Sequence, residues 1–255
     1  MNTLVLLRMV PDLVEELEVD ASGKALDRQW LRFVLNEMDD HALEEALLLK
    51  ERYDGSVTVL TLDAPEVDDV LFTAVAKGAD RVVKITHSFD GVSVWVLSQL
   101  LAQVVPTFPY DLILTGVQAV DDLDGGLAPM LAAQLRLPYL GPVTAIRADP
   151  NAKVATVERE LAGGVKGEYR LPLPCVLGIQ AAEKPPRYVA VSRVRQAMKA
   201  ARIEEMPAPR VTVRSPVAVR RLYKPEVAGR AEMLEGTPQE VAQKLVAILA
   251  ERGVL

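Results

Sequence analysis

The fold is decided by one stretch, Asp111-Leu112-Ile113-Leu114-Thr115-Gly116-Val117-Gln118-Ala119-Val120-Asp121-Asp122-Leu123-Asp124-Gly125-Gly126. It begins as an apolar strand, reaches a glycine and continues through small and acidic residues into a new helix. Open α/β sheets bind nucleotides at such turns, where the carboxyl end of a strand meets the amino end of a helix. The stretch therefore predicts an α/β fold with a ligand pocket at this edge of the sheet.

The acidic residues of this stretch leave its ligand ambiguous. Backbone amides after Gly116 and at the start of the next helix could hold a phosphate. Asp121, Asp122 and Asp124 would repel that phosphate unless they cap the helix, pair with a basic side chain or bind a cation. Aspartate before a helix is also common where no ligand binds. The residues alone fit a nucleotide site and a ligand-free capping loop equally well.

The rest of the chain alternates strands and helices, which is typical of a parallel sheet covered by helices. We expect strands at residues 3–10, 57–62, 81–85 and 111–115, and helices at residues 39–52, 67–77, 92–105 and 124–135. After residue 143 we expect a hairpin of strands 154–161 and 168–173 and a further short strand at 175–179. The predicted fold class is α/β, a mostly parallel doubly wound sheet with added antiparallel edge strands.

The last fifty residues predict an arm followed by a helix. Residues 207–236 have no clear periodicity and contain many charges and prolines, which indicates a segment that crosses a partner or the protein's own surface. Thr237 fits the N-cap of the last helix, with Pro238 in its first turn and Glu240 at capping-box spacing. We therefore expect a nucleotide-binding domain at residues 1–206 and a C-terminal arm and helix at residues 207–255.

Composition excludes several classes of protein. The chain has 255 residues, of which 50% are hydrophobic and 25% charged, so it can bury a large core. Its net charge of −6 offers no basic field for nucleic acid, and no uncharged apolar run is long enough to span a bilayer. The amino terminus lacks the pattern of an export signal, and the single Cys175 cannot form an internal disulfide. We expect a cytoplasmic protein with no nucleic-acid partner and no membrane insertion.

The residue patterns of common enzymes are missing. Cys175 lies in an apolar run, which favours a buried thiol over a catalytic nucleophile. Two histidines and one cysteine give no zinc pattern. The glycine fingerprints of dinucleotide sites and P-loops are also absent from the sequence. We therefore expect no catalytic residues and no metal site.

Five segments in chain order resemble the β subunits of electron transfer flavoproteins. They are Leu35-Asn36-Glu37-Met38-Asp39 with Ala42-Leu43-Glu44-Glu45-Ala46 and Lys50, Lys77-Gly78-Ala79-Asp80-Arg81, residues 111–122, Val157-Glu158-Arg159-Glu160-Leu161-Ala162-Gly163-Gly164, and Pro186-Arg187-Tyr188. In that family the β subunit buries a structural AMP and pairs with an α subunit that holds most of a redox-active FAD. The heterodimer passes electrons from acyl-CoA dehydrogenases of fatty acid oxidation, and from other flavin dehydrogenases, to a quinone reductase.

The resemblance implies an AMP pocket between the first strand, the helix after Asn36, the turn after the second strand and the loop of residues 116–127. The implied AMP-binding residues are Leu6, Asn36, Glu37, Met38, Asp39, Leu62, Asp63, Gly116, Gln118, Val120, Asp121, Asp122, Asp124, Gly125, Gly126 and Leu127. Asn36 also fits the ordinary N-cap of the following helix. The chain departs from the family at Asp63-Ala64-Pro65, where a glycine is expected, and at Leu123, where an acidic residue is common.

The resemblance also implies contacts with the flavin and with protein partners. Leu13 and Met38 match positions that lean on the dimethylbenzene edge of the flavin, and both fit plain core packing as well. Glu160 matches an acidic residue that meets an arginine of the α subunit, although such a glutamate is more often solvated surface. The segment that docks onto dehydrogenases corresponds to residues 189–196, and its implied docking residues are Val191, Arg193, Val194 and Arg195.

The implied function is that of an electron carrier subunit that holds cofactor and partners in position and makes no bonds itself. Two alternatives remain open. A flavin-bifurcating member of the family would hold a second FAD in place of AMP. An adenine-nucleotide-binding α/β protein of another function would need a Ser/Gly-rich turn after the first strand, where this chain has Arg8-Met9-Val10-Pro11-Asp12.

Overall fold

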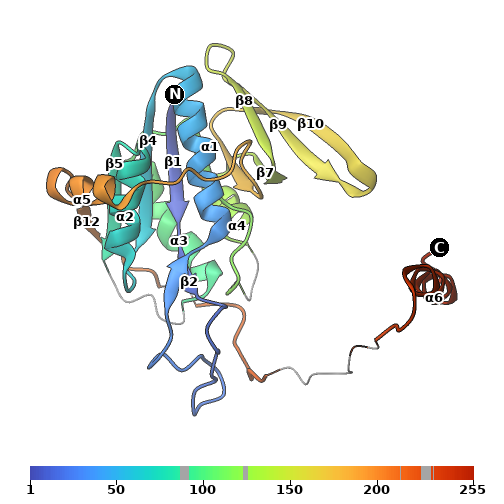
Figure 1. Cartoon of the computed structure of the whole chain (residues 1–255). Coiled ribbons are helices and arrows are strands. Elements are labelled where there is room, and N and C mark those ends of the chain that lie inside the picture. Colours follow the sequence, from blue (N-terminus) through green and yellow to red (C-terminus); the bar gives the residue numbers. More distant parts are fainter. Residues whose placement is uncertain (87–91, 123–125, 213, 225–230, 232) are drawn as a thin grey trace. The chain divides into compact units, whose positions relative to one another are not determined.

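Seven parallel strands form the central sheet of the computed structural model, which describes residues 1–86, 92–122, 126–212, 214–224, 231 and 233–255 (Figure 1). The strand order is β12-β5-β4-β1-β6-β11-β7, and each neighbouring pair is parallel. The strands are β1 (Asn2–Leu7), β4 (Ser56–Leu62), β5 (Arg81–Thr86), β6 (Leu112–Gly116), β7 (Tyr139–Val143), β11 (Cys175–Ile179) and β12 (Glu204–Pro207).

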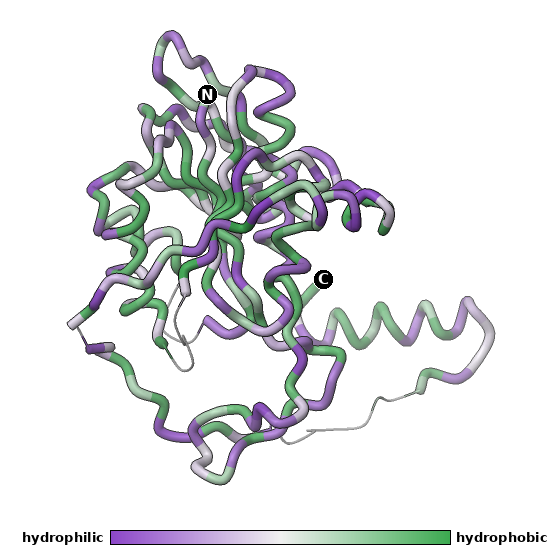
Figure 2. The backbone as a smooth tube through the Cα atoms, turned by 90° about the vertical axis from the view of Figure 1, so that its left-hand side faces the viewer, coloured by the Kyte–Doolittle hydropathy of each residue, from purple (hydrophilic) through white to green (hydrophobic). Residues whose placement is uncertain are grey.

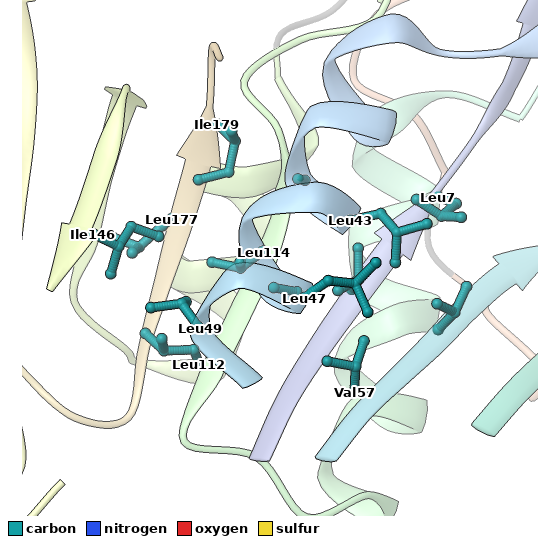
Figure 3. Packing of buried hydrophobic residues seen from close by; sticks show 14 of the residues in the cluster. Leu7, Leu43, Leu47, Leu49, Val57, Leu112, Leu114, Ile146, Leu177 and Ile179 are labelled. Carbon is teal, nitrogen blue, oxygen red and sulfur yellow. The ribbon is translucent and has the colours of Figure 1, made fainter. Parts of the chain in front are cut away.

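Helices cover both faces of this sheet. Helices α1 (Glu37–Tyr53) and α2 (Val67–Lys77) pack on one face, and α3 (Val94–Val104) and α4 (Leu127–Leu135) pack on the other. Leu43, Leu47 and Leu49 of α1 lie against the side chains of the strands beneath them (Figure 3). Burying each such leucine stabilises the fold by roughly 1.5 to 3 kcal/mol. Strands covered on both faces need continuous apolar runs, and the central strands are coloured as hydrophobic along most of their length in Figure 2.

The chain winds outward from the middle of the sheet in both directions. It begins at β1, moves through β4 to β5 on one side, and returns to β6 on the other side of β1. At this reversal the carboxyl ends of β1 and β6 lie side by side, which is where open α/β sheets bind ligands, and we call this place the β1/β6 crevice. The loop of residues 117–126 starts at this crevice.

Two smaller antiparallel sheets accompany the central one. Strands β8 (Ala145–Asp149), β9 (Val154–Leu161) and β10 (Val165–Pro172) form a three-stranded sheet, and β2 (Met9–Pro11) pairs with β3 (Phe33–Leu35). Short 3-10 turns occupy Val105–Thr107 and Ala162–Gly164. The apolar face of β8 and β9, with Ile146, Ala155 and Val157, joins the same hydrophobic cluster as α1.

The expected α/β class with its parallel sheet is confirmed, and the structure adds detail that the pattern lacked. The hairpin strands form a sheet of their own, and residues 175–179 lie inside the parallel sheet between β6 and β7. The first strand stops at Leu7, because the chain leaves the sheet at Arg8 to form β2. Strands β7 and β12 and helix α5 (Val191–Ala200) were not expected, since each is short and only partly buried.

The chain forms two compact units, residues 1–222 and residues 223–255. The second unit contains helix α6 (Pro238–Glu251), which begins at Thr237 with the expected capping box. No residue of α6 is buried, and Leu245 and Val246 on it are exposed. None of the helices in the described part of the chain is long and apolar enough to cross a membrane.

Helix α1 also holds a distant segment in place through its polar face. His41 Nδ1 accepts a hydrogen bond from the Ala182 amide at 3.2 Å, and Glu45 Oε2 accepts one from the Glu183 amide at 3.0 Å. The buried Glu44 carboxylate binds both the amide and the guanidinium of Arg187, with a shortest distance of 2.8 Å. The residues of the α1 motif and of the Pro186-Arg187-Tyr188 motif are therefore parts of one structural contact.

Glu45 should make stability depend on pH. Burial raises the pKa of Glu45 from 4.5 to about 7. The carboxyl of Glu45 loses its proton at a lower pH in the unfolded chain than in the folded one. Its contribution to the free energy of unfolding is therefore favourable at low pH and is lost as the pH rises from 4.5 through about 7. A difference of this size corresponds to roughly 3 kcal/mol.

We expect Glu45→Gln to remove this fall in unfolding free energy, measured by urea denaturation between about pH 5 and pH 8. Glu51→Gln, which changes an exposed carboxylate of the same helix, should keep the wild-type pH dependence. If the free energy of unfolding changed with pH equally in wild type and Glu45→Gln, the raised pKa of Glu45 would not be the cause of the pH dependence.

Candidate functional site

Three charged side chains meet at the crevice between β1 and β6. Arg8 directly follows β1, Asp39 lies in the first turn of α1, and Asp122 lies in the loop after β6. Arg8 is 8% exposed, Asp39 is fully buried, and the side chain of Asp122 is 7% exposed. Buried charges of this kind persist only where they are paired and hydrogen-bonded.

Asp39 connects three elements through its carboxylate. Its Oδ1 accepts hydrogen bonds from the Gly116 amide at 2.6 Å and the Thr115 hydroxyl at 3.1 Å, and its Oδ2 accepts one from the Arg8 amide at 2.9 Å. Burial raises the pKa of Asp39, and the positive charge of Arg8 opposes that rise. Asp39 therefore fixes the start of α1 against the ends of both β1 and β6.

Arg8 pairs with the acidic loop. Its guanidinium binds Asp122 through two contacts, Nη1 to Oδ1 at 2.6 Å and Nη2 to Oδ2 at 3.3 Å. Asp122 Oδ2 also accepts the Ala119 amide at 2.8 Å, which closes the turn after β6. One of the loop's aspartates is thus neutralised by a basic side chain, as a phosphate ligand would require.

The glycine at the end of β6 is required by close packing. A Cβ atom at Gly116 would lie 2.7 Å from both Asp39 Oδ1 and Met38 Cβ. Real Cβ atoms do not approach other atoms this closely, so any side chain here would push the first turn of α1 away from β6. The glycine that marked this stretch in the sequence keeps the crevice narrow.

Asn36 links the two sides of the crevice. It occupies the N-cap position of α1, but its side chain does not cap the helix. Its Nδ2 instead donates to the Gln118 carbonyl at 3.1 Å, and its amide donates to the Arg8 carbonyl at 2.9 Å. The ordinary capping interpretation of Asn36 is therefore replaced by a contact with the loop after β6.

The predicted nucleotide residues gather at this edge of the sheet. Leu6, Leu62 and Leu127 line a small cavity of about 10 Å³ together with Arg8. Of the other predicted residues, Met38 and Gly126 are half-buried, and Glu37, Asp63, Gln118, Val120 and Asp121 are exposed. Asp124 and Gly125 lie outside the described residues. The nucleotide-binding role of this set remains a prediction.

Met38, one of the two predicted flavin residues, lies at the crevice, and the predicted partner residues lie on α5 and β9. Leu13 is 60% exposed in the turn after β2, while Met38 packs beside Gly116. On α5, Val191 is 61% exposed, Arg193 and Arg195 are exposed, and Val194 is half-buried.

Glu160 lies near the end of β9, 3.8 Å from Lys166. Both residues line a cavity of about 450 Å³ with Thr144, Gln180 and Glu183. The walls are polar, so this cavity differs from the mostly apolar pockets that bind small molecules. Its acidic members suit a basic side chain better than an anion.

Sequence reasoning missed Arg8 and Thr115 as members of the site. The signal for Arg8 was present, because the acidic loop required a basic partner and Arg8 directly follows the strand next to β6. Cys175 is confirmed as a buried thiol, since burial raises its pKa to about 12 and leaves no reactive thiolate.

Comparisons with known proteins show the family of the chain. A family model described as "Electron transfer flavoprotein domain" matches residues 24–211. The chain is similar to the electron transfer flavoprotein subunit beta of Methylophilus methylotrophus, with 32% identity over 98% of both chains. The chain belongs to the electron transfer flavoprotein β-subunit family.

Two further relatives match nearly the whole length of the chain. The subunit beta of Bacillus subtilis is 30% identical over 98% of this chain and 97% of its own. A protein of Acetobacterium woodii named "Caffeyl-CoA reductase-Etf complex subunit CarD" is 30% identical over 100% of both chains. Members of the electron transfer flavoprotein family with different names thus match this chain from end to end.

We expect Arg8→Met to lower the free energy of unfolding by about 3 to 5 kcal/mol, because it leaves Asp39 and Asp122 as buried charges without their cation. Urea denaturation measures this loss. Arg81→Met breaks an ion pair with Glu204 in which both side chains are 40% or more exposed, and should cost about 1 kcal/mol or less. Similar losses for the two variants would show that Arg8 does not hold the crevice together.

Proposed function

We propose that this chain is the β subunit of a cytoplasmic, heterodimeric electron transfer flavoprotein. In this role it binds AMP at the β1/β6 crevice and helps to position an FAD held mainly by an α subunit. The heterodimer accepts electrons from acyl-CoA and other flavin dehydrogenases and passes them to a quinone reductase. The chain carries no bond-making catalysis of its own in this proposal.

The observation that supports this proposal best is the ion pair between Arg8 and Asp122, which lies where the strand order of the sheet reverses. Without it, the loop after β6 would present unpaired aspartates to any phosphate. With Asp122 bound to Arg8, and with Asp39 occupied by backbone and Thr115 donors, both carboxylates are already satisfied. The crevice can then accept an adenosine phosphate through the backbone amides of the loop and of the start of α4.

A second FAD in place of AMP is the alternative within the family. A full-length relative is named as a subunit of a caffeyl-CoA reductase-Etf complex, so relatives at this level of identity differ in their electron partners. Both nucleotides share an adenosine phosphate, and the same crevice would hold that part of either one.

Acid extraction of the coexpressed heterodimer, followed by chromatography of the released nucleotides, separates these functions. We expect one FAD and one AMP for each heterodimer. Two FAD for each heterodimer would establish the bifurcating alternative. A chain that purifies without a second subunit and without flavin colour, or that turns over ATP, would contradict the proposal.

The proposed contacts with partners use three surfaces. Leu13 and Met38 face the flavin, Glu160 and the arm and helix of residues 207–255 contact the α subunit, and α5 docks onto dehydrogenases. Exposed apolar residues support the last two surfaces, since Leu245 and Val246 on α6 and Val191 on α5 are left uncovered. The contact with the α subunit is tested by Glu160→Lys and by truncation after residue 222, each of which should reduce the yield of heterodimer. An unchanged yield in both variants would show that neither Glu160 nor the C-terminal segment contacts the α subunit.

We expect Val191→Asp to raise the KM for the donor dehydrogenase about tenfold or more, because interface energy concentrates in a few apolar anchors flanked by charge. Steady-state electron transfer to a quinone acceptor dye measures this change, and the nucleotide content should stay the same. Lys199→Ala, at the far end of the same helix, is the control. An unchanged KM for Val191→Asp would exclude this face of α5 from docking.

A further inference from the structure

Helix α5, the proposed docking helix, is poorly stabilised by its own sequence. Of its ten residues, all of which the structure describes, Ala197 alone is buried. Its N-cap Ala190 makes no side-chain hydrogen bond to the helix, and Arg193 places a cation in the first turn, where the helix dipole disfavours positive charge. Isolated helices of this length are marginal in water. Contacts made outside α5 must therefore hold it in place.

Arg187 supplies such a contact shortly before Val191, the first residue of α5. Its amide donates to Glu44 Oε2 at 2.9 Å, and its guanidinium binds the same carboxylate through Nε at 2.9 Å and Nη2 at 2.8 Å. Its Nη1 binds Glu51, further along α1, at 2.7 Å. Glu44 is 3% exposed, and charge-assisted hydrogen bonds to a buried carboxylate are strong. We call Arg187 with these two carboxylates the Arg187 clamp.

The same guanidinium also reaches α2, the helix on which α5 packs. Arg187 Nη1 donates to the carbonyl of Lys77, the last residue of α2, at 3.5 Å. Helix α5 lies beside α2, and the chain crosses α1 to reach this place (Figure 1). The Ala182 and Glu183 amides bind α1 along the way. Arg187 therefore ties the connection to both α1 and α2 at the point where it enters α5.

We propose that Arg187 is a positioning residue that orders α5 before the donor dehydrogenase docks on it. This inference rests on the proposed function, because it assigns a role at the α5 docking surface. An interface segment that is already ordered loses less conformational entropy when its partner binds, so the affinity is higher. Arg187 acts through the position of Val191 and not by touching the dehydrogenase.

The buried charges of the clamp require a paired substitution. Removing Arg187 alone leaves Glu44 as a buried charge without its cation, which lowers the stability of the whole protein. Glu44→Gln combined with Arg187→Gln replaces the buried ion pair by two neutral amides and removes the contact with Glu51. Replacing both members of a buried ion pair costs far less than removing one. The double variant therefore loosens the clamp in a folded protein.

Hydrogen exchange and steady-state electron transfer by the intact heterodimer test the proposal, with a purified acyl-CoA dehydrogenase as the donor. In Glu44→Gln/Arg187→Gln we expect the amides of α5 to exchange about tenfold faster, while those of β1 and β6 exchange as in wild type. The KM for the dehydrogenase should rise about fivefold to tenfold, with kcat and the nucleotide content unchanged.

Three further variants show whether the effect passes through α5. Arg187→Lys keeps the charge without the planar fork, so its KM should lie between those of wild type and the double variant. Adding Val191→Asp to the double variant should raise KM little beyond Val191→Asp alone, because both changes act at one surface. Arg147→Gln is the control, since Arg147 also binds two carboxylates but lies on β8, and it should change neither α5 exchange nor KM.

The outcomes separate the possible failures. Unchanged exchange of α5 in the double variant overturns this inference. Faster exchange of α5 with an unchanged KM, in a protein whose KM does respond to Val191→Asp, also overturns it and leaves the proposed function intact. A KM that responds neither to Val191→Asp nor to the double variant overturns the docking role of α5 in the proposed function, and this inference with it.

Discussion

The ion pair between Arg8 and Asp122, together with the buried Asp39 carboxylate beside it, is the constraint on which the site depends. The ends of β1 and β6 and the first turn of α1 meet at the same point, and each contributes a charge or an amide to the network. Removing any member leaves a buried charge without compensation, which is far more costly than losing a surface contact. Within the same network, Arg8 neutralises Asp122 of the acidic loop.

Helix α1 connects this network to the rest of the protein. Its first turn supplies Asp39, its apolar stripe packs on the sheet, and its polar side chains Glu44 and Glu45 hold residues 183–187. That segment leads directly into α5, the surface proposed to meet dehydrogenases. Asp39, Glu44, Glu45 and Arg187, which belong to the segments that resemble the family, bind other parts of the same chain.

The sequence predicted the parallel sheet well because buried parallel strands are continuous apolar runs, as in residues 112–115 and 175–179. The sequence pattern located the hairpin, but it did not show that the hairpin strands belong to a separate sheet, because strand pairing between distant segments leaves no local pattern. Short edge elements such as β12 and α5 were missed, since partial burial weakens periodicity. Arg8 was missed as a site residue because its role depends on β1 lying next to β6, a feature of topology. Glu45 could not be predicted as a buried acid for the same reason.

The affinity for AMP across a double-mutant cycle of Arg8→Gln and Asp122→Asn tests the central claim most directly. If Arg8 serves to neutralise Asp122 beside the phosphate, Arg8→Gln alone should weaken AMP binding about tenfold or more, and adding Asp122→Asn should restore much of the loss. Losses that simply add, or a double variant that binds AMP no better than Arg8→Gln, would contradict the account.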